Sequence, residues 1–294
     1  MHKIPASKHN LEKFFQGLPW SDLEIKITPY FESKEKASDY IKTIQAEARM
    51  GLNLISSSLL KSHRVLEVGS GMGLLAGYLS SLGFNITALE PGLGGFGISR
   101  ILAEATQCFP GFASLERLHI SAERLSKQTE GEFDFIYSVN VLEHIPNLEE
   151  TICAMGNVLS EKGVMVHTCP NYAIPYEPHF GIPLVPVAPR LTIKLLPKSK
   201  DSELWKSLNF ITATRLIRAC RAHDLIIELE PGVMLRTFTR FDTDPEFRRR
   251  QGNSFVFGIF LFLKLTGLLY LLGKLPASWS TPMVAKITHR KSKS

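Results

Sequence analysis

The sequence predicts an α/β fold built on a doubly wound, mostly parallel sheet, and three observations support this prediction. Short apolar runs alternate with helical stretches between residues 65 and 169, a pattern typical of parallel strands joined by right-handed crossovers. The first run contains Glu67 and passes into a glycine-rich turn. The second run ends at Glu90. Such turns and acids predict a ligand site at the carboxyl edge of the sheet.

The elements follow in chain order. Residues 1–32 have a mixed composition, and we expect a substrate-side cap or a docking arm there. Residues 33–60 predict one or two helices beside the sheet. A basic amphipathic helix at 212–223 precedes a further strand at 225–229. The five strands before them are predicted at 65–69, 85–90, 115–120, 133–139 and 164–169.

Glycines occupy alternate positions at the end of the stretch VLEVGSGMG, residues 65–73. Glycine at a turn lets the backbone adopt positive φ and approach a ligand closely. The following helix, 74–82, directs its first N–H groups to the same place. A dinucleotide fingerprint, G-x-G-x-x-G, would need a glycine where the chain has Leu74, so a nicotinamide-dependent dehydrogenase is disfavoured. A plain glycine-rich loop is the alternative interpretation of this motif taken alone.

The pattern E-x-G-x-G-x-G resembles motif I of the class I S-adenosylmethionine-dependent methyltransferases, including the ubiquinone-biosynthesis O-methyltransferase-like group. Three further motifs follow in that family's order: NITALE, HISAE and FDFIYSVNVLEHIP, which begin at residues 85, 119 and 133. The resemblance covers 65–171 well and extends more loosely to 229. It implies a Rossmann-like, doubly wound, mostly parallel seven-stranded sheet, a methyltransferase activity and S-adenosylmethionine as cofactor.

The resemblance also assigns the cofactor-binding residues. Glu67 suits the positively charged amino-acid end of the cofactor, and Glu90 would accept hydrogen bonds from both ribose hydroxyls. Ser121 stands where the family usually has Asp, and its hydroxyl would contact the adenine amino group. The expected cofactor-binding residues are Glu67, Gly69, Ser70, Gly71, Gly73, Glu90, Pro91, Ser121, Ala122, Asn140 and Val141.

Candidates for chemistry at the methyl acceptor follow the fifth strand. The segment PNYAIPYEPHF, residues 170–180, combines aromatic, carboxylate and imidazole groups at the carboxyl end of a parallel strand. Methyl transfer needs alignment of the reacting atoms and, for some acceptors, a base. His179 is the best candidate base, because its ordinary pKa lies near neutrality. Tyr172, Tyr176 and Glu177 could orient the substrate; a proline-stiffened structural loop is the alternative.

A metal site at Glu143 and His144 is a further alternative. Some relatives, including small-RNA 2′-O-methyltransferases, hold a divalent metal with a Glu-x-x-Glu-His pattern and a later histidine. The first position of that pattern is Asn140 in this chain, which weakens the expected site. We therefore predict no metal and interpret Glu143 and His144 as a helix start near the substrate cleft. His167, inside a buried strand, is interpreted as a core histidine.

Composition agrees with a cytoplasmic enzyme. The 294 residues are 44% hydrophobic, which is enough to bury a full core. Cys108, Cys153, Cys169 and Cys220 show no metal-like or disulfide-like spacing, as in a reducing compartment. No apolar run follows the N-terminus, so we expect no signal peptide.

The C-terminal part, 245–294, is predicted to be a basic, apolar, membrane-associating tail with helical character. Residues 255–272 carry one charge, Lys264, and the tail holds nine basic residues against one acid, or +8 of a whole-chain net charge of +6. This combination suits an anionic membrane surface, whereas nucleic acid gives no reason for the apolar run. The run could lie in the interface or re-enter it, span the membrane once, or pack as a buried helix.

Together these features predict three regions: a helical cap at 1–60, a methyltransferase domain at 61–240 and the tail. A substrate-side insertion at 172–208 holds a second apolar stretch, 184–197, which could be a membrane lip or a lid. We expect methylation of a small-molecule or lipid-like acceptor, namely a lipid, a quinone or a lipid-linked glycan, at the cytoplasmic face of a membrane. A non-catalytic methyltransferase-fold protein that binds cofactor or partners is the alternative. The oligomeric state is left open.

Overall fold

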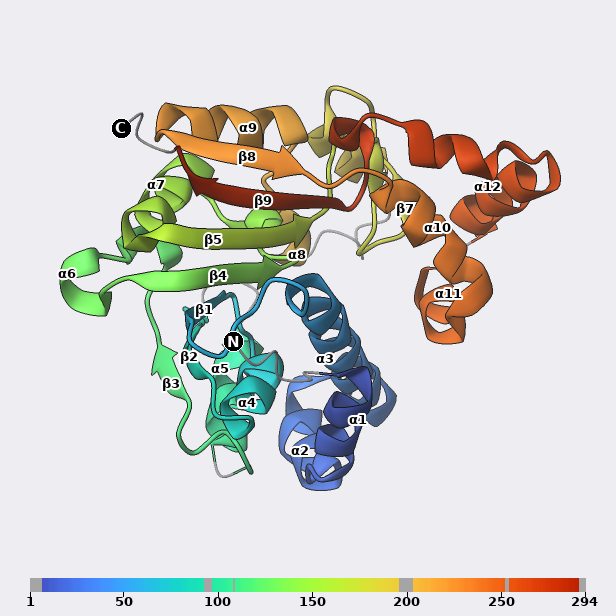
Figure 1. The fold of residues 1–294 in the computed structure, drawn as a ribbon. Helices are drawn as coiled ribbons and strands as arrows, with labels where there is room; N and C mark the ends of the chain where they lie inside the picture. The colour runs from blue at the N-terminus through green and yellow to red at the C-terminus, as the bar shows by residue number, and fades with distance from the viewer. Residues whose placement is uncertain (1–6, 93–96, 108, 196–202, 252–253, 291–294) are drawn as a thin grey trace.

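A seven-stranded sheet forms the centre of the computed structural model, which describes residues 7–92, 97–107, 109–195, 203–251 and 254–290 (Figure 1). The strand order is β3-β2-β1-β4-β5-β9-β8. The first five strands are parallel, and β9 runs antiparallel to both of its neighbours. This is the predicted Rossmann-like sheet. The strands are β1 Arg64–Val68, β2 Asn85–Leu89, β3 Glu116–Leu118, β4 Phe133–Val139, β5 Leu159–Cys169, β8 Leu225–Leu229 and β9 Met283–His289.

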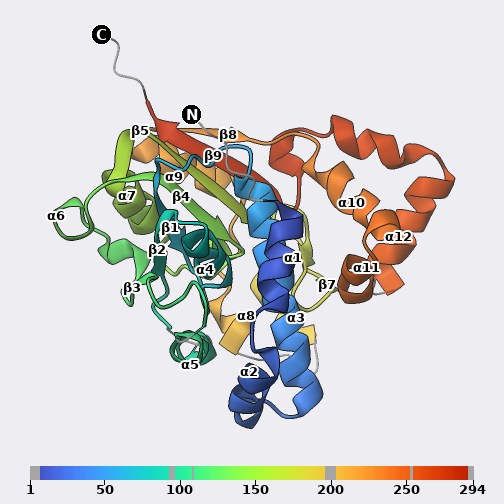
Figure 2. The ribbon, with the colours of Figure 1, turned by 60° about the horizontal axis from the view of Figure 1, so that its bottom comes forward.

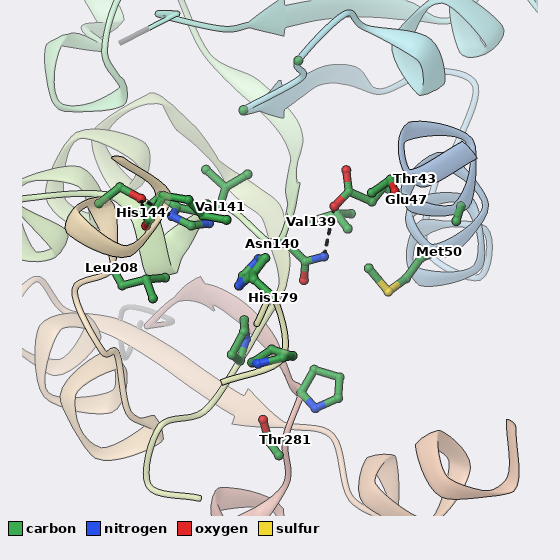
Figure 3. A pocket seen from close by; sticks show the side chains of 18 of the residues that line it. Thr43, Glu47, Met50, Val139, Asn140, Val141, His144, His179, Leu208 and Thr281 are labelled. Atoms are coloured by element: carbon green, nitrogen blue, oxygen red, sulfur yellow. Dashed lines mark hydrogen bonds between the residues drawn. The ribbon is translucent and has the colours of Figure 1, made fainter. Parts of the chain in front are cut away.

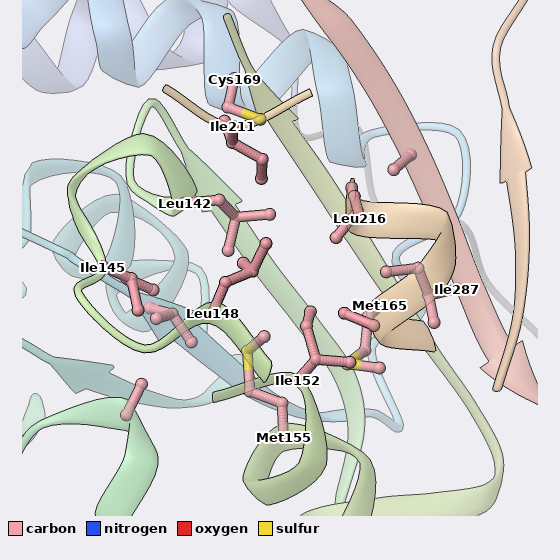
Figure 4. Packing of buried hydrophobic residues seen from close by; sticks show 14 of the residues in the cluster. Leu142, Ile145, Leu148, Ile152, Met155, Met165, Cys169, Ile211, Leu216 and Ile287 are labelled. Atoms are coloured by element: carbon pink, nitrogen blue, oxygen red, sulfur yellow. The ribbon is translucent and has the colours of Figure 1, made fainter. Parts of the chain in front are cut away.

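Helices cover both faces of the sheet, because successive side chains of each strand point to opposite faces. On β4, Ile136 belongs to the cluster that includes residues of α7 and α9, such as Ile152 and Leu216 (Figure 4). Phe135 and Tyr137 pack against the side that holds α1, α3, α4 and α5. The helices of these two layers are α1 Lys8–Gln16, α2 Trp20–Ile27, α3 Lys34–Ile55, α4 Leu74–Ser81, α5 Gly97–Thr106, α6 Lys127–Glu130, α7 Leu148–Val158 and α9 Ala213–Ala222.

The N-terminal helices are fixed to the sheet through α3. Ser33 caps α3, since its hydroxyl accepts a hydrogen bond from the N–H of Lys36. Arg49 on α3 forms a two-point ion pair with Glu12 on α1, with N–O distances of 2.6 and 2.8 Å. The predicted helix at 33–60 is therefore present as α3, which contacts β4 and β5 (Figure 1).

A helical insertion separates the last two strands. We call residues 233–279 the C-terminal arm. It projects from the end of the sheet at which the strands finish (Figures 1 and 2), and an aromatic cluster that includes Phe241, Phe247 and Phe260 holds its helices together. The arm consists of α10 Val233–Thr243, α11 Pro245–Gln251, α12 Ser254–Leu265, η7 Leu268–Lys274 and η8 Ala277–Trp279.

The structure corrects the expectation that 245–294 is a tail outside the domain. β9 lies between β5 and β8, and its buried residues Met283, Ala285 and Ile287 alternate with more exposed ones. Asn171 lies two residues after the end of β5. Its side-chain amide donates hydrogen bonds to the carbonyls of Ser278 and Ser280 at 2.8 and 3.1 Å. The reversed strand of the sheet is therefore β9, and the strand at 225–229 is not the last one.

The expected concentration of basic charge beside the apolar run is also only partly present. Arg290 follows β9 at the end of the sheet opposite the arm (Figure 1), and residues 291–294 lie outside the described part. Within the arm, Lys264 is paired with Asp242, with Nζ 2.7 Å from both carboxylate oxygens. The arm itself carries seven basic and three acidic residues.

The apolar run forms two helices instead of one. α12 and η7 meet at an angle of 103°, with Gly267 at φ +71° in the break. No single helix among the described residues is both long and apolar enough to cross a bilayer. The bent pair of α12 and η7 has the length and apolar composition of a membrane span only when the two helices are counted together. Among the side chains of α12 described, from Phe255 to Leu265, most are exposed, and Phe260 is the one that is fully buried.

Candidate active site

A cavity of about 1780 Å³ opens at the carboxyl ends of β1, β4 and β5 (Figure 3). Its walls come from the glycine-rich loop, from α3, from the segment after β5 and from the C-terminal arm. Most of the site residues expected from the sequence line it. These are Glu67, Gly69, Ser70, Gly71, Glu90, Pro91, Ser121, Ala122, Asn140, Val141, His144, Tyr176 and His179.

The glycine-rich loop has the expected positive φ angles at Gly69, Gly71 and Gly73. A Cβ at Gly69 would come within 2.4 Å of the Val141 side chain, so this glycine allows the two loops to pack. A Cβ at Gly71 would meet nothing within 4 Å, and this open space belongs to the cavity. Gly73 does not line the cavity and is the N-cap residue of α4. The loop therefore offers a surface to a ligand at Gly71.

Glu90 joins the first two loops. Its carboxylate accepts hydrogen bonds from the N–H of Gly71 and the N–H of Gly92, each at 2.9 Å. Burial raises the pKa of Glu90 above its ordinary value, and the two backbone hydrogen bonds oppose that shift. Each carboxylate oxygen keeps a further lone pair, so the residue can still accept hydrogen bonds from a ligand.

Glu67 lies deeper than Glu90, underneath the glycine-rich loop. Its carboxyl group accepts a hydrogen bond from the N–H of Ala76 at 3.2 Å, which ties β1 to the first turn of α4. Burial raises the pKa of Glu67 to about 8, against the lowering influence of Tyr137 and Arg117. A cationic ligand group nearby would favour the ionised form.

The wall opposite the loop contains residues that the sequence analysis did not identify. Tyr40, Thr43, Glu47 and Met50 of α3 line the cavity, and Glu47 accepts a long hydrogen bond of 3.4 Å from the amide of Asn140 (Figure 3). Their spacing of three, four and three residues places them on one face of the helix. That spacing is visible in the sequence, but nothing in it shows that the face lines a site.

The segment after β5 contains a fully buried carboxylate, Glu177. It accepts hydrogen bonds from the hydroxyl of Tyr172 at 3.1 Å, from Nδ1 of His179 at 2.6 Å and from the N–H of Phe180 at 2.7 Å. Tyr172 is directed at Glu177 and does not line the cavity, whereas Tyr176 and His179 do. Burial alone would lower the pKa of His179, but Glu177, Glu143 and Glu47 together raise it above its ordinary value.

Glu143, His144 and His179 form a compact group whose potential ligand atoms all lie within 4.8 Å of one another. Both carboxylate oxygens of Glu143 are buried without a hydrogen-bond partner, and burial raises its pKa to about 8. Burial and the neighbouring His179 lower the pKa of His144 to about 3, so this ring is neutral at physiological pH. Such a group could hold a divalent ion, and the alternative metal pair of the sequence analysis thus remains a hypothesis.

The far end of the cavity belongs to the C-terminal arm and is mostly apolar, with Thr237, Arg240 and Arg249 as its polar residues. Side chains of α10 and α12 form this end, which is continuous with the space beside His179. The apolar run, whose composition suggested a membrane contact, therefore also lies next to the site. The arm residues of this end include Met234, Phe238, Phe241, Val256, Ile259 and Leu263.

Comparison with known proteins identifies the family. A family described as "Methyltransferase domain" matches residues 40–228. The chain belongs to this methyltransferase family. It is also 31% identical, over 261 residues, to the uncharacterized protein Rv1509 of Mycobacterium tuberculosis, covering 83% of this chain and 86% of that protein.

Two further methyltransferases are similar to this chain, the first over a smaller part of its length and the second at lower sequence identity. A ubiquinone biosynthesis O-methyltransferase of Aromatoleum aromaticum is 26% identical over 163 residues, or 55% of this chain and 63% of that enzyme. The O-methyltransferase of a trans-AT polyketide synthase multienzyme of Brevibacillus brevis, solved with S-adenosylhomocysteine, has a TM-score of 0.51 at 13% identity. It covers 91% of this chain and 79% of its own, and it supports the fold assignment.

The methyltransferase uses S-adenosylmethionine, and its loop residues fit that cofactor. The open space at Gly71 accommodates a ligand against the backbone. The hydroxyl oxygen of Ser70 is buried without a hydrogen-bond partner at the edge of the same space, which leaves a polar group for the ligand to satisfy. Ser121 and Ala122, which begin the short helix η3 (Ala122–Arg124), line the wall where the adenine is expected.

Proposed function

We propose that this methyltransferase methylates a lipid-like, membrane-associated acceptor held between His179 and the C-terminal arm. One observation supports this proposal above all: a single cavity runs from Gly71, past His179, to the apolar side chains of α10 and α12. Pockets for one small molecule typically measure about 300–1000 Å³. A volume of about 1780 Å³ therefore leaves room for an acceptor beside the cofactor.

The residues at the glycine-rich end of the cavity would bind and orient the cofactor. S-adenosylmethionine supplies, when bound, a methyl group on a positively charged sulfur. Gly69, Ser70 and Gly71 would provide the backbone surface, and Glu90 would accept hydrogen bonds from the ribose. Asn140, at a positive φ of 54°, would present its backbone and amide beside the reacting groups. Holding both reactants in one geometry is the main contribution that such a site makes to the rate.

His179 would act as the general base. Glu177 fixes its ring, and the Nδ1 atom donates to that carboxylate, so Nε2 is the nitrogen available to the acceptor. Nε2 would take the proton of an acceptor hydroxyl or amine as the methyl group is transferred. Tyr172 acts through Glu177 and is a positioning residue, whereas Tyr176 lines the cavity and could contact the acceptor.

Peripheral membrane association through the arm is the second part of the proposal. Fourteen large hydrophobic side chains in the described part are exposed, and nine of them lie between Phe255 and Trp279. An exposed apolar region of this density indicates an interaction surface. Cys153, Cys169 and Cys220 are free thiols, which agrees with the cytoplasmic face.

The test uses the full chain, S-adenosylmethionine with a labelled methyl group, and a bacterial membrane lipid extract. We expect labelled lipid with the wild type, far less with His179→Ala, and wild-type levels with the matched control His223→Ala, which changes an exposed histidine. Calorimetry with S-adenosylhomocysteine runs in parallel. Cofactor binding without any labelled product would contradict the proposal and favour the non-catalytic alternative.

A further inference from the structure

Helix α12 separates the cavity from the outside of the molecule. Val256, Ile259 and Leu263 on one side of the helix line the cavity. Phe257 and Phe260 on a second side pack against Phe241 of α10. The remaining side faces outward and carries large apolar residues, namely Leu261, Phe262 and Leu265, with exposed fractions of 40, 60 and 85%. α12 is thus apolar toward the cavity, toward the arm and toward the exterior.

Two residues of α12 stand where the cavity reaches the surface. Phe255 and Ile259 line the cavity and are also 55 and 38% exposed. The edge of the opening at α12 is therefore apolar on both its inner and outer sides. An apolar chain could keep apolar contact as it passes these two side chains, whereas a strongly hydrated ligand would gain nothing from them. Arg249, which also lines the cavity and is half exposed, is paired with Asp39.

We infer that the outward side of α12 docks on an anionic lipid bilayer, and that the acceptor's hydrocarbon chain passes from the bilayer past Phe255 and Ile259 into the cavity. This inference rests on the proposed function and specifies its substrate. The acceptor is an amphiphile whose chain enters the enzyme with its reactive group. A lipid-linked glycan, whose chain would stay in the membrane, does not match the apolar lining.

Charge supports a bilayer as the partner of this surface. The arm has seven basic and three acidic residues, a net charge of +4. Lys264, the one charged residue of the α12 sequence SFVFGIFLFLKL, is paired with Asp242 on α10. The pairing lowers the cost of bringing this side of the arm to the interface, because a paired charge is less costly to desolvate than an isolated one. Figure 2 shows the arm projecting away from the sheet, with α12 at its outer side.

Two matched substitutions on one helix test the inference. Leu263→Glu places a carboxylate on the cavity side of α12, and Leu265→Glu places the same group on the outward side. Vesicle binding is measured by co-sedimentation with phosphatidylglycerol–phosphatidylcholine vesicles. Chain uptake is measured with cis-parinaric acid, a fatty acid whose fluorescence rises in apolar surroundings, without vesicles present. Binding of S-adenosylhomocysteine controls for folding of both variants and does not require turnover.

We expect Leu265→Glu to weaken vesicle binding at least fivefold and to leave uptake of parinaric acid within twofold of wild type. Leu263→Glu should do the reverse. The inference is wrong if the wild type does not bind these vesicles, if both variants lose the same property, or if neither loses any. Because no readout involves methyl transfer, an inactive enzyme that passes these tests would contradict the proposed function alone.

Discussion

Nδ1 of His179 lies 2.6 Å from Oε1 of Glu177, and this short contact fixes the ring and its tautomer. A carboxylate can only accept a hydrogen bond, so Nδ1 carries the proton. The same carboxylate accepts from Tyr172 and from the backbone of Phe180, and it is fully buried. His179 therefore has a fixed orientation at the cavity wall, which is what a base aligned with an acceptor requires.

Replacing His179 by alanine should reduce turnover far more than it reduces cofactor affinity. Loss of a general base typically lowers the rate by about 10²–10⁴-fold. The measurement is steady-state methyl transfer together with calorimetry of S-adenosylhomocysteine. Unchanged turnover would place the base elsewhere, or show that the acceptor needs none.

Glu177→Gln should move the pH dependence of turnover. A base must be neutral to act, so the rate should rise with pH through the pKa of His179. That pKa lies above its ordinary value of 6.5, because the influence of the carboxylates exceeds that of burial. Without the charge of Glu177, the lowering effect of burial on the pKa of His179 is opposed less. The rise of the rate with pH should therefore occur at lower pH. A profile at the wild-type position would show that Glu177 has only a packing role.

Gly71→Arg should abolish cofactor binding and leave the domain folded. The side chain would occupy the open space beside the loop, at a φ of +56° that L-residues rarely adopt. Gly267→Arg is the matched control, because Gly267 also has a positive φ with nothing within 4 Å, but lies in the arm. Cofactor affinity of Gly71→Arg within about twofold of the control would contradict the motif assignment.

Glu90→Ala should weaken cofactor binding by about 1.5–3 kcal/mol, the usual contribution of hydrogen bonds to charged groups. Acceptor affinity should change much less. Glu116→Ala is a suitable comparison, since Glu116 accepts a hydrogen bond from Thr87 on the neighbouring strand and does not line the cavity. Equal losses for both ligands in Glu90→Ala would indicate that the carboxylate only holds the loops together.

Removal of the arm, with the strand after it retained, should release the enzyme from vesicles and preserve cofactor binding. Leu235 and Gly273 are neighbours, since a Cβ at Gly273 would lie 2.9 Å from the Leu235 side chain. A short Gly-Ser linker can therefore replace residues 236–272. Deletion of 245–294 should instead give an insoluble protein, because it removes β9. A linker variant that binds vesicles as the wild type does would exclude the arm as the membrane contact.

The glycine-rich side of the cavity could be predicted because its residues are close together in sequence. The turn after β1 and the acid after β2 are local patterns, and parallel pairing brings them together at one edge. The first five strands, α3, α4 and α9 were predicted for the same reason, by periodicity and by turn residues. His167 lies in the core as predicted: it is fully buried and its Nδ1 bonds to the Ser138 hydroxyl at 2.7 Å, whereas its Nε2 has no hydrogen-bond partner.

The acceptor side could not be predicted in this way. It is assembled from α3, the segment after β5 and the arm, which only the tertiary fold brings together. Glu177 was expected to orient the substrate, but it orients His179. β9 was missed because its short alternation, MVAKITH, follows a long apolar run and precedes basic residues. The position of a strand in a sheet depends on distant partners, which its own sequence does not reveal.

The place of β9 in the sheet has a consequence for biosynthesis. β5 and β8 are both synthesised before β9, and 53 residues, 230–282, separate β8 from the strand that must fit between them. Until residues 283–289 leave the ribosome, the edge of β5 lacks β9 as its partner, whereas the apolar arm, which precedes β9 in the chain, emerges earlier. Such an intermediate exposes both an unpaired strand edge and a hydrophobic surface, the two features that favour aggregation. Early capture of the arm by a chaperone or a bilayer would protect the nascent chain while its sheet is still incomplete.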